Sequence, residues 1–335
     1  MAQSFQPLAH FRTIPQPIQA AIFMVGAALL FAALSATIRH LSEGLHTFEV
    51  TFFRNFAGLV FMLPWLFRSG LSGLRTGRFM LYTWRSFLSL VSMLCGFTSL
   101  TLLPFDKAIA LSFTVPLFAT AGAAMFLGED VRARRWTATI IGFIGVLIIL
   151  HPGLGDANLL CGGGRAALGA GLSLFSALIS AVITLIVKDL ARTEPSDAIV
   201  TYMVLLLTPM SLLPAIPYWE WPPVEMWLWI VIMGAFGSFG HMCFIRAFAK
   251  ADASAVMPYD YTRMIFAAII GYFAFGEAPE IWTWIGAAVI ASAAIYIARR
   301  ETIRRQSVAT TAAAAAGEPA APATIVRPES GSAER

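Results

Sequence analysis

The stretch from Pro116 to Trp136 reads PLFATAGAAMFLGEDVRARRW, and Gly142-Phe-Ile-Gly145 follows it closely. A similar order returns near the end of the chain as Ala255-Val-Met-Pro258, Phe275-Gly-Glu277, Trp282 and Gly286. In both places an apolar segment that contains a proline ends in Gly-Glu, and an apolar segment led by a tryptophan follows. The spacings differ by several residues, as expected of distant internal homology. The sequence therefore predicts two related halves.

The whole chain contains ten apolar runs. A run of about 20 apolar residues spans a bilayer as a helix. The runs cover residues 18–38, 47–67, 79–101, 107–127, 136–151, 166–187, 197–217, 226–248, 254–275 and 281–298. The connections are short and rich in turn residues, as in His151-Pro-Gly153. Because lipid cannot hydrogen-bond an open strand edge, helices are the expected form. The predicted fold class is an all-α polytopic membrane protein with ten transmembrane helices.

Composition supports this prediction. The chain is 58% hydrophobic and 13% charged, whereas soluble domains carry about 25% charged residues. The net charge of +4 does not indicate nucleic-acid binding, because the basic residues lie between apolar runs and not on one element. Cys95, Cys161 and Cys243 are far apart, so neither a disulfide framework nor a zinc site is indicated. We expect no metal and no cofactor.

The basic residues also predict an orientation, because cytoplasmic loops of membrane proteins carry an excess of lysine and arginine. If the N-terminus is cytoplasmic, the cytoplasmic segments hold fourteen basic residues and the outer segments hold three. Ten spans then place both termini in the cytoplasm, and the expected location is the inner membrane. A cluster of tryptophans is expected at the surface of the inner membrane that faces away from the cytoplasm: Trp219, Trp221, Trp227 and Trp229.

The predicted organisation has five parts. They are a cytoplasmic N-terminal segment 1–17, a first repeat 18–152, an outer loop 153–164, a second repeat 165–300 and a disordered, alanine-rich cytoplasmic tail 301–335. Each repeat has five helices, and five is odd, so the second repeat enters the membrane from the opposite side. Such inverted repeats are typical of secondary transporters, which bind solute near the midplane between the repeats.

The chain resembles the EamA-type proteins of the drug/metabolite transporter superfamily over residues 18–300. The motifs that carry the resemblance are Phe52-Phe53-Arg54-Asn55, Phe113-Thr114-Val115-Pro116, Leu127-Gly128-Glu129, His151-Pro152-Gly153, Arg246–Ser254, Pro258-Tyr-Asp-Tyr261 and Phe275-Gly-Glu277. The resemblance implies a ten-helix carrier of a small-molecule substrate, with a central cavity and alternating access. The stretch Leu45–Arg54 looks similar to the branch of S-adenosylmethionine uptake transporters. Similar proteins carry riboflavin, and others export amino acids or drugs.

Ionisable residues inside spans are costly and usually face a cavity or a partner. In the first half, Arg54 lies deep in the second run, and Arg85 lies beside Trp84 in the third. We predict all three as substrate-binding or coupling residues. Pairing is the alternative for Arg54, and extension of the charged head to the membrane surface is the alternative for Arg85.

In the second half, the candidates are His241, Tyr259, Asp260 and Arg263. Asp260 and Arg263 are three residues apart and share a helix face. They form either a substrate or proton site, or a structural ion pair. Tyr259 either stacks on a planar solute or packs. His241 is a proton carrier or a hydrogen-bonded packing residue.

A secondary carrier is the main hypothesis, and both coupling to protons and a homodimer are left open. The nucleotide-binding Gly-x4-Gly-Lys-Ser/Thr loop is absent from the sequence, so a solute or ion gradient must supply the energy. An intramembrane enzyme is the alternative of another class, but the five histidines show no His-Glu-x-x-His spacing and no Gly-x-Ser-x-Gly is present. A channel or a non-transporting receptor is the third alternative.

Overall fold

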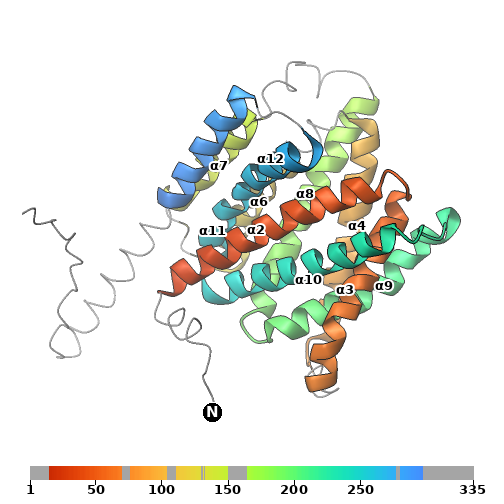
Figure 1. Ribbon diagram of the computed structural model, residues 1–335. Coiled ribbons are helices and arrows are strands. Elements are labelled where there is room, and N and C mark those ends of the chain that lie inside the picture. Colours follow the sequence, from red (N-terminus) through yellow and green to blue (C-terminus); the bar gives the residue numbers. More distant parts are fainter. Residues whose placement is uncertain are drawn as a thin grey trace, which may run out of the picture.

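The computed structural model describes residues 15–69, 76–103, 111–129, 131, 133–149, 164–276 and 280–296. Over this part of the chain the regular elements are helices, and no strand is present. The helices are α2 (Gln16–Leu41), α3 (Thr47–Ser69), α4 (Phe79–Leu102), α6 (Val115–Phe126), α7 (Ala133–Ile149), α8 (Arg165–Leu190), α9 (Ser196–Ala215), η4 (Ile216–Tyr218), α10 (Met226–Lys250), α11 (Ala253–Val256), η5 (Met257–Tyr261), α12 (Thr262–Phe275) and a last helix, Ile281–Tyr296. They pack into one bundle (Figure 1).

Each of the ten predicted runs overlaps a helical segment of the described chain, so the all-α prediction is confirmed. Consecutive segments α11, η5 and α12 together match the ninth run. Five helices of the described residues are long and apolar enough to cross a membrane by length and composition: Gln16–Leu41, Thr47–Phe67, Arg165–Leu190, Ser196–Tyr218 and Met226–Lys250. The predicted tail 301–335, and most of the N-terminal segment and outer loop, lie outside the described residues.

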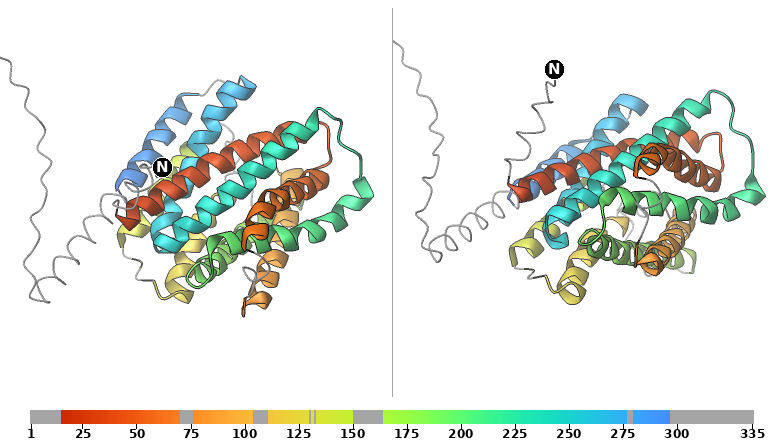
Figure 2. Two further views of the ribbon diagram at one scale, coloured as in Figure 1. Left: turned by 60° about the horizontal axis from the view of Figure 1, so that its bottom comes forward. Right: turned by 90° about the horizontal axis from the view of Figure 1, so that it is seen from below.

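The two halves pack against each other in a symmetric pattern (Figures 1 and 2). Helix α2 packs along α10, just as α8 packs along α4. Helix α2 also contacts α12, and α8 contacts α6, while α3 and α9 contact each other. In order along each half, α2 corresponds to α8, α3 to α9, α4 to α10 and α6 to α12. The contact between α2 and α10 then corresponds to that between α8 and α4, and the contact between α2 and α12 to that between α8 and α6. The contact between α3 and α9 corresponds to itself. The two-repeat prediction is therefore confirmed.

The ends of three helices show that the second half is inverted. Lys188, at the end of α8, donates from Nζ to the carbonyl oxygen of Phe248, near the end of α10, at 2.8 Å. Lys250, at the end of α10, donates to Gln19 Oε1, near the start of α2, at 2.7 Å. Helix α8 therefore runs in the direction of α10 and opposite to α2.

The repeated Gly-Glu motif has a structural reason. Gly128 ends α6 with φ 62°, and Gly276 ends α12 with φ 69°. This left-handed conformation is unfavourable for residues with a Cβ, and glycine is therefore common just after a helix. The prolines that precede the motifs interrupt their spans. Pro116 lies in the first turn of α6, and Pro258 lies in the 3-10 segment η5.

Glycines of α10 permit close contacts with neighbouring helices. A Cβ at Gly234 would lie 2.8 Å from the carbonyl carbon of Ala57 on α3, and a Cβ at Gly240 would lie 2.9 Å from the Phe31 ring on α2. A third close contact joins α7 to the last helix. A Cβ at Gly286 would lie 2.4 Å from the carbonyl oxygen of Gly145. The neighbour is backbone, so it cannot turn aside.

Replacing Gly286 by Val should therefore lower the melting temperature of the purified protein in detergent. Overpacking a tight contact costs about 1–3 kcal/mol. Gly171→Val is the matched control, because this helical glycine has nothing within 4 Å of the added Cβ. Equal melting temperatures for the two variants would contradict the contact.

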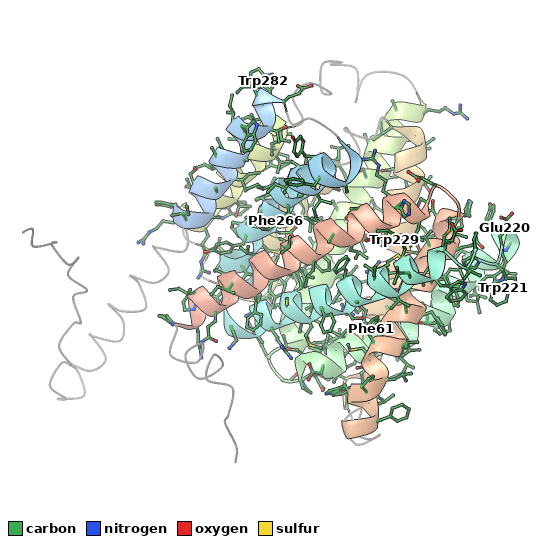
Figure 3. The ribbon with its side chains drawn as sticks, in the orientation of Figure 1. Phe61, Glu220, Trp221, Trp229, Phe266 and Trp282 are labelled. Carbon is green, nitrogen blue, oxygen red and sulfur yellow. The ribbon has the colours of Figure 1, made fainter. Side chains whose placement is uncertain are left out.

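Tryptophans gather at the end of the bundle where α10 begins (Figure 3). Trp221 is 73% exposed there, and its ring meets that of Trp219 edge to face at 5.6 Å. Glu49 is buried at the same end and accepts a hydrogen bond from the backbone N–H of Glu220. Glu49 is therefore tied to the protein and does not extend into water.

Candidate functional site

Three of the predicted residues come together inside the bundle, from three helices. A Cβ at Gly237 of α10 would lie 3.8 Å from Nε of Arg54, which is on α3. One turn further along α10, His241 Nδ1 lies 2.8 Å from the carbonyl oxygen of Gly237. Arg54 and Arg85, the latter on α4, both lie within electrostatic range of the His241 ring. We call Arg54, Arg85 and His241 the arginine–histidine group.

The three residues lie well inside the bundle. Arg54 is nearer to one end of it, and Arg85 and His241 are counted from the other. At a rise of 1.5 Å per residue, Arg54 lies about 10 Å from the start of α3, and Arg85 about 9 Å from the start of α4. Arg85 is on the half of the membrane where α10 ends, since Arg78, just before α4, pairs with Asp189 at the end of α8. His241 lies about 13 Å from the end of α10.

Arg85 is the most deeply buried of the three residues. Its side chain is 3% exposed, and among the described residues Nε and Nη1 have no hydrogen-bond partner. Nη2 donates to the sulfur of Met203, on α9, at 3.4 Å. A buried guanidinium without a partner is expensive, because it has lost its water and gained no acceptor in exchange. Its burial argues against extension to the membrane surface.

The buried surroundings of Arg85 include a tyrosine that the sequence reasoning missed. Tyr82 lies one turn before Arg85, and its hydroxyl also has no partner within the described chain. Its ring stacks on that of Tyr202 with centroids 4.4 Å apart. The three-residue spacing from Arg85 was the available signal, since residues three apart share a helix face.

No described carboxylate forms an ion pair with Arg54 or Arg85, and the group therefore carries net positive charge. Such a group has the donors and the charge that suit hydrogen-bond acceptors or an anion. Arginine is suited to this role because its planar fork offers five N–H donors.

Trp84 lies apart from this group. Its side chain is 55% exposed, and its ring meets Phe87 edge to face at 6.0 Å. Adjacent residues on a helix point about 100° apart, so Trp84 faces outward while Arg85 faces inward. We leave Trp84 out of the site that we propose.

Asp260 and Arg263 form a second group. Arg263 Nη2 lies 3.5 Å from Asp260 Oδ2, so the predicted shared face is confirmed. The guanidinium of Arg263 also lies over the Phe113 ring, 5.1 Å from its centroid. The described contacts connect this pair to Phe113 and not to the arginine–histidine group.

Tyr259 and His241 both make packing contacts. Tyr259 is 6% exposed and belongs to the main apolar core. The ring of His241 meets Phe31 edge to face at 4.9 Å. These contacts fit the packing alternatives, while the position of His241 near two arginines also fits a binding role. For metals, the described residues contain no group of three or more His, Cys, Asp or Glu that is placed to hold an ion.

An inverted-repeat bundle that buries arginines with no carboxylate partner among its described residues is the arrangement expected of a polytopic solute transporter. The model of the EamA-like transporter family matches residues 18–151 and 167–299. The chain therefore belongs to the EamA-like transporter family.

Named relatives agree with this assignment. The chain is 34% identical over 291 residues to the riboflavin transporter of Vibrio cholerae, covering 85% of this chain and 95% of the relative. It is 31% identical to the S-adenosylmethionine uptake transporter of Rickettsia felis, covering 77% of this chain and 85% of the relative. A solved crystal structure matches with a TM-score of 0.72 at 20% identity, over 84% of this chain and 98% of the other, and supports the fold.

Proposed function

We propose that this transporter carries a planar organic metabolite rich in hydrogen-bond acceptors, with riboflavin as the first candidate, and that the arginine–histidine group binds it. The observation that carries the proposal is the buried guanidinium of Arg85, whose Nε and Nη1 have no hydrogen-bond partner among the described residues. Riboflavin offers carbonyl oxygens and ring nitrogens as acceptors, and its flat ring system suits stacking near Tyr82. The resemblance to the riboflavin transporter of Vibrio cholerae supports this choice.

S-adenosylmethionine is the second candidate. Its carboxylate suits Arg85, and the relative in Rickettsia felis is named for its uptake. Its sulfonium, however, is positively charged and would be repelled by Arg54 and Arg85 unless a carboxylate offset their charge, and the arginine–histidine group contains no carboxylate. Asp260, which has the required charge, is paired with Arg263. We therefore rank riboflavin above S-adenosylmethionine, and either one above the amino acids or drugs that related exporters move.

The position of the arginine–histidine group supports alternating access. Arg54 and Arg85 belong to the first half, and His241 belongs to the second. A rocking motion of one half against the other would expose a solute held between them to each side in turn. We place the chain in the inner membrane with both termini in the cytoplasm, on the strength of the loop charges. Proton coupling through His241 or Asp260, and a homodimer, stay predictions.

Reconstituted protein tests the proposal. Proteoliposomes loaded with unlabelled riboflavin should take up labelled riboflavin by counterflow that saturates with concentration, and S-adenosylmethionine should compete more weakly. Liposomes without protein are the control. Saturable counterflow of S-adenosylmethionine without riboflavin flux would reverse the ranking. Riboflavin flux that rises linearly with concentration would indicate a channel.

A further inference from the structure

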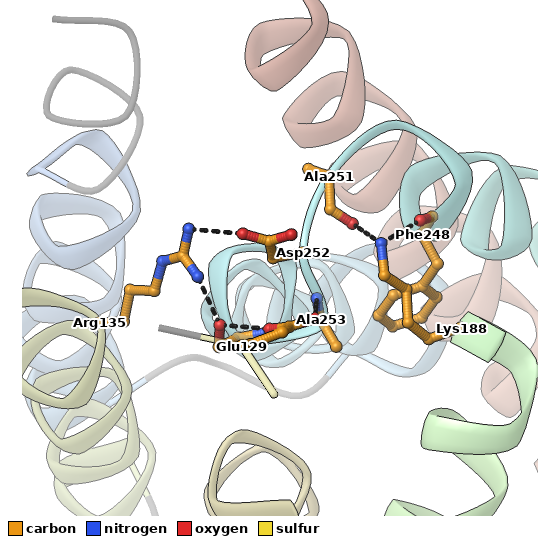
Figure 4. A network of polar contacts seen from close by, with 8 residues as sticks. Glu129, Arg135, Lys188, Phe248, Ala251, Asp252 and Ala253 are labelled. Carbon is orange, nitrogen blue, oxygen red and sulfur yellow. Dashed lines mark hydrogen bonds and ion pairs between the residues drawn. The ribbon is translucent and has the colours of Figure 1, made fainter. Parts of the chain in front are cut away.

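A polar network joins the two halves at one end of the bundle (Figure 4). At its centre is Glu129, which follows Gly128 just after the end of α6. Its Oε1 accepts from the backbone N–H of Ala253 at 2.8 Å, and its Oε2 accepts from the backbone N–H and the hydroxyl of Ser254, at 3.0 and 2.6 Å. A carboxylate at a helix start satisfies N–H groups that lack helical partners.

Two basic residues complete the network. Arg135, at the start of α7, is 4% exposed and donates to Ser254 Oγ at 2.7 Å and to Asp252 Oδ2 at 2.9 Å. Lys188, 6% exposed, donates to the carbonyl oxygens of Phe248 and Ala251 at 2.8 and 2.6 Å. Glu129 and Arg135 come from the first half, and their partners come from the second. We call Glu129, Arg135, Asp252 and Ser254 the latch.

The opposite side of the bundle shows a different arrangement. Helices α3 and α9 are joined in the interior by Asn55 Nδ2, which donates to Ser211 Oγ at 3.1 Å. Polar contacts also join the halves near both ends of this pair. Glu49 accepts from the Glu220 N–H at one end, and Glu194 accepts from the Thr76 hydroxyl at the other. Polar contacts therefore join α3 and α9 at both ends, whereas the latch joins the halves through other elements at one end.

We infer that the latch is a gate, closed in this structure, and that Glu129 must release the backbone of Ala253 and Ser254 each time the transporter opens at this end. The inference rests on the alternating access in the proposed function. It adds which contacts break and on which side. By the loop charges, the latch end is the cytoplasmic one. The segment that Glu129 holds leads directly into η5, so opening also moves Tyr259 and Asp260.

Cysteine accessibility tests the gate without any solute, so its result does not depend on the identity of the substrate. Cys95, Cys161 and Cys243 are first replaced by Ser. A reporter cysteine is then introduced as Val256→Cys, because Val256 is 1% exposed just behind the latch. Labelling of purified protein in detergent with a polyethylene glycol maleimide is followed by gel shift.

Glu129→Gln should raise the labelling rate of the reporter about tenfold, which corresponds to about 1.4 kcal/mol in favour of the open state. The amide keeps the size of the carboxylate but loses its charge and one acceptor oxygen. Glu194→Gln is the matched control, since Glu194 also bridges the halves but lies on the α3–α9 side. It should leave the rate unchanged. Arg134→Cys, on the exposed surface, should label equally with and without the Glu129 change.

An unchanged labelling rate in folded Glu129→Gln would overturn the gate, as would an equal increase in the Glu194 control. If Glu129→Gln does not fold, Ser254→Ala replaces it. This change removes the hydroxyl that contacts both Glu129 and Arg135 while leaving the backbone N–H in place. It should raise the rate at least about threefold, or about 0.7 kcal/mol, and no increase would overturn the inference. Loss of riboflavin counterflow with normal gating would instead count against the proposed substrate.

Discussion

Replacing Arg85 by Met should abolish riboflavin counterflow and at the same time leave the protein equally stable or more stable. The guanidinium is buried with two nitrogens unpartnered among the described residues, so the folded protein bears a desolvation cost that nothing in that part of the chain repays. Replacing buried charges with apolar residues of similar volume is often neutral or stabilising, by about 1–4 kcal/mol. Bound solute would supply the missing acceptors. Loss of the Arg85 guanidinium should reduce transport at least about a hundredfold, which corresponds to about 2.7 kcal/mol.

This pairing of effects separates a binding role from a structural one. Counterflow measures transport, and a melting curve in detergent measures stability. Arg246→Met is the matched control, because Arg246 is an exposed arginine that pairs with Asp197 at 3.3 Å. It should change neither quantity much. Arg85→Lys should restore only part of the transport, since an ammonium lacks the planar fork. A large drop in stability together with normal transport per folded molecule would refute the role of Arg85 in binding.

Asp260→Asn and Arg263→Ala should each strongly weaken transport while the protein stays in the membrane. Each change leaves the other member of a partly buried pair without its counter-charge. Removing one partner of a buried pair costs about 3–5 kcal/mol, and the exposure of Arg263 reduces this figure here. Counterflow, normalised to the amount of protein in the membrane, measures the effect.

The double variant Asp260→Asn with Arg263→Gln distinguishes the two interpretations of this pair. It removes both charges, so no unpaired charge remains. If the pair has only a structural role, the double variant should transport better than either single variant. If Asp260 binds solute or a proton, as we predict, the double variant should stay inactive. Wild-type transport in both single variants would remove the pair from the site.

The apolar runs predicted the helices well because a span must satisfy its own backbone hydrogen bonds, and this is a local requirement. Inversion was predictable for a similar reason, since it follows from the odd number of helices in each repeat. The neighbours Trp84 and Arg85 show where this reasoning fails. Hydrophobicity places both in one span, but the packing of α4 against α8 and α9 decides which side chain turns inward.

The latch was harder to predict than the helices. The sequence marks Leu127-Gly-Glu129 as a motif, and glycine after α6 has a local explanation. The partners of Glu129 lie more than a hundred residues away in the chain, at Ala253 and Ser254. Only the packing of one half against the other brings them within hydrogen-bond distance. That no described residue pairs with Nε or Nη1 of Arg85 also depends on tertiary packing, since any span could have supplied a carboxylate.

The opposed directions of α2 and α8 explain why the two halves have diverged so far in their loops. The same five-helix unit is threaded through the bilayer twice, once each way, so equivalent loops emerge at opposite faces. Arginines that keep a loop of one copy on the cytoplasmic side would favour the wrong side of the membrane for the equivalent loop of the other copy. After the first Gly-Glu the chain carries Arg132, Arg134 and Arg135, whereas after the second it continues Ala-Pro-Glu-Ile with no basic residue. Duplication alone would have kept these loops alike, and it is the direction of threading that requires their charges to differ.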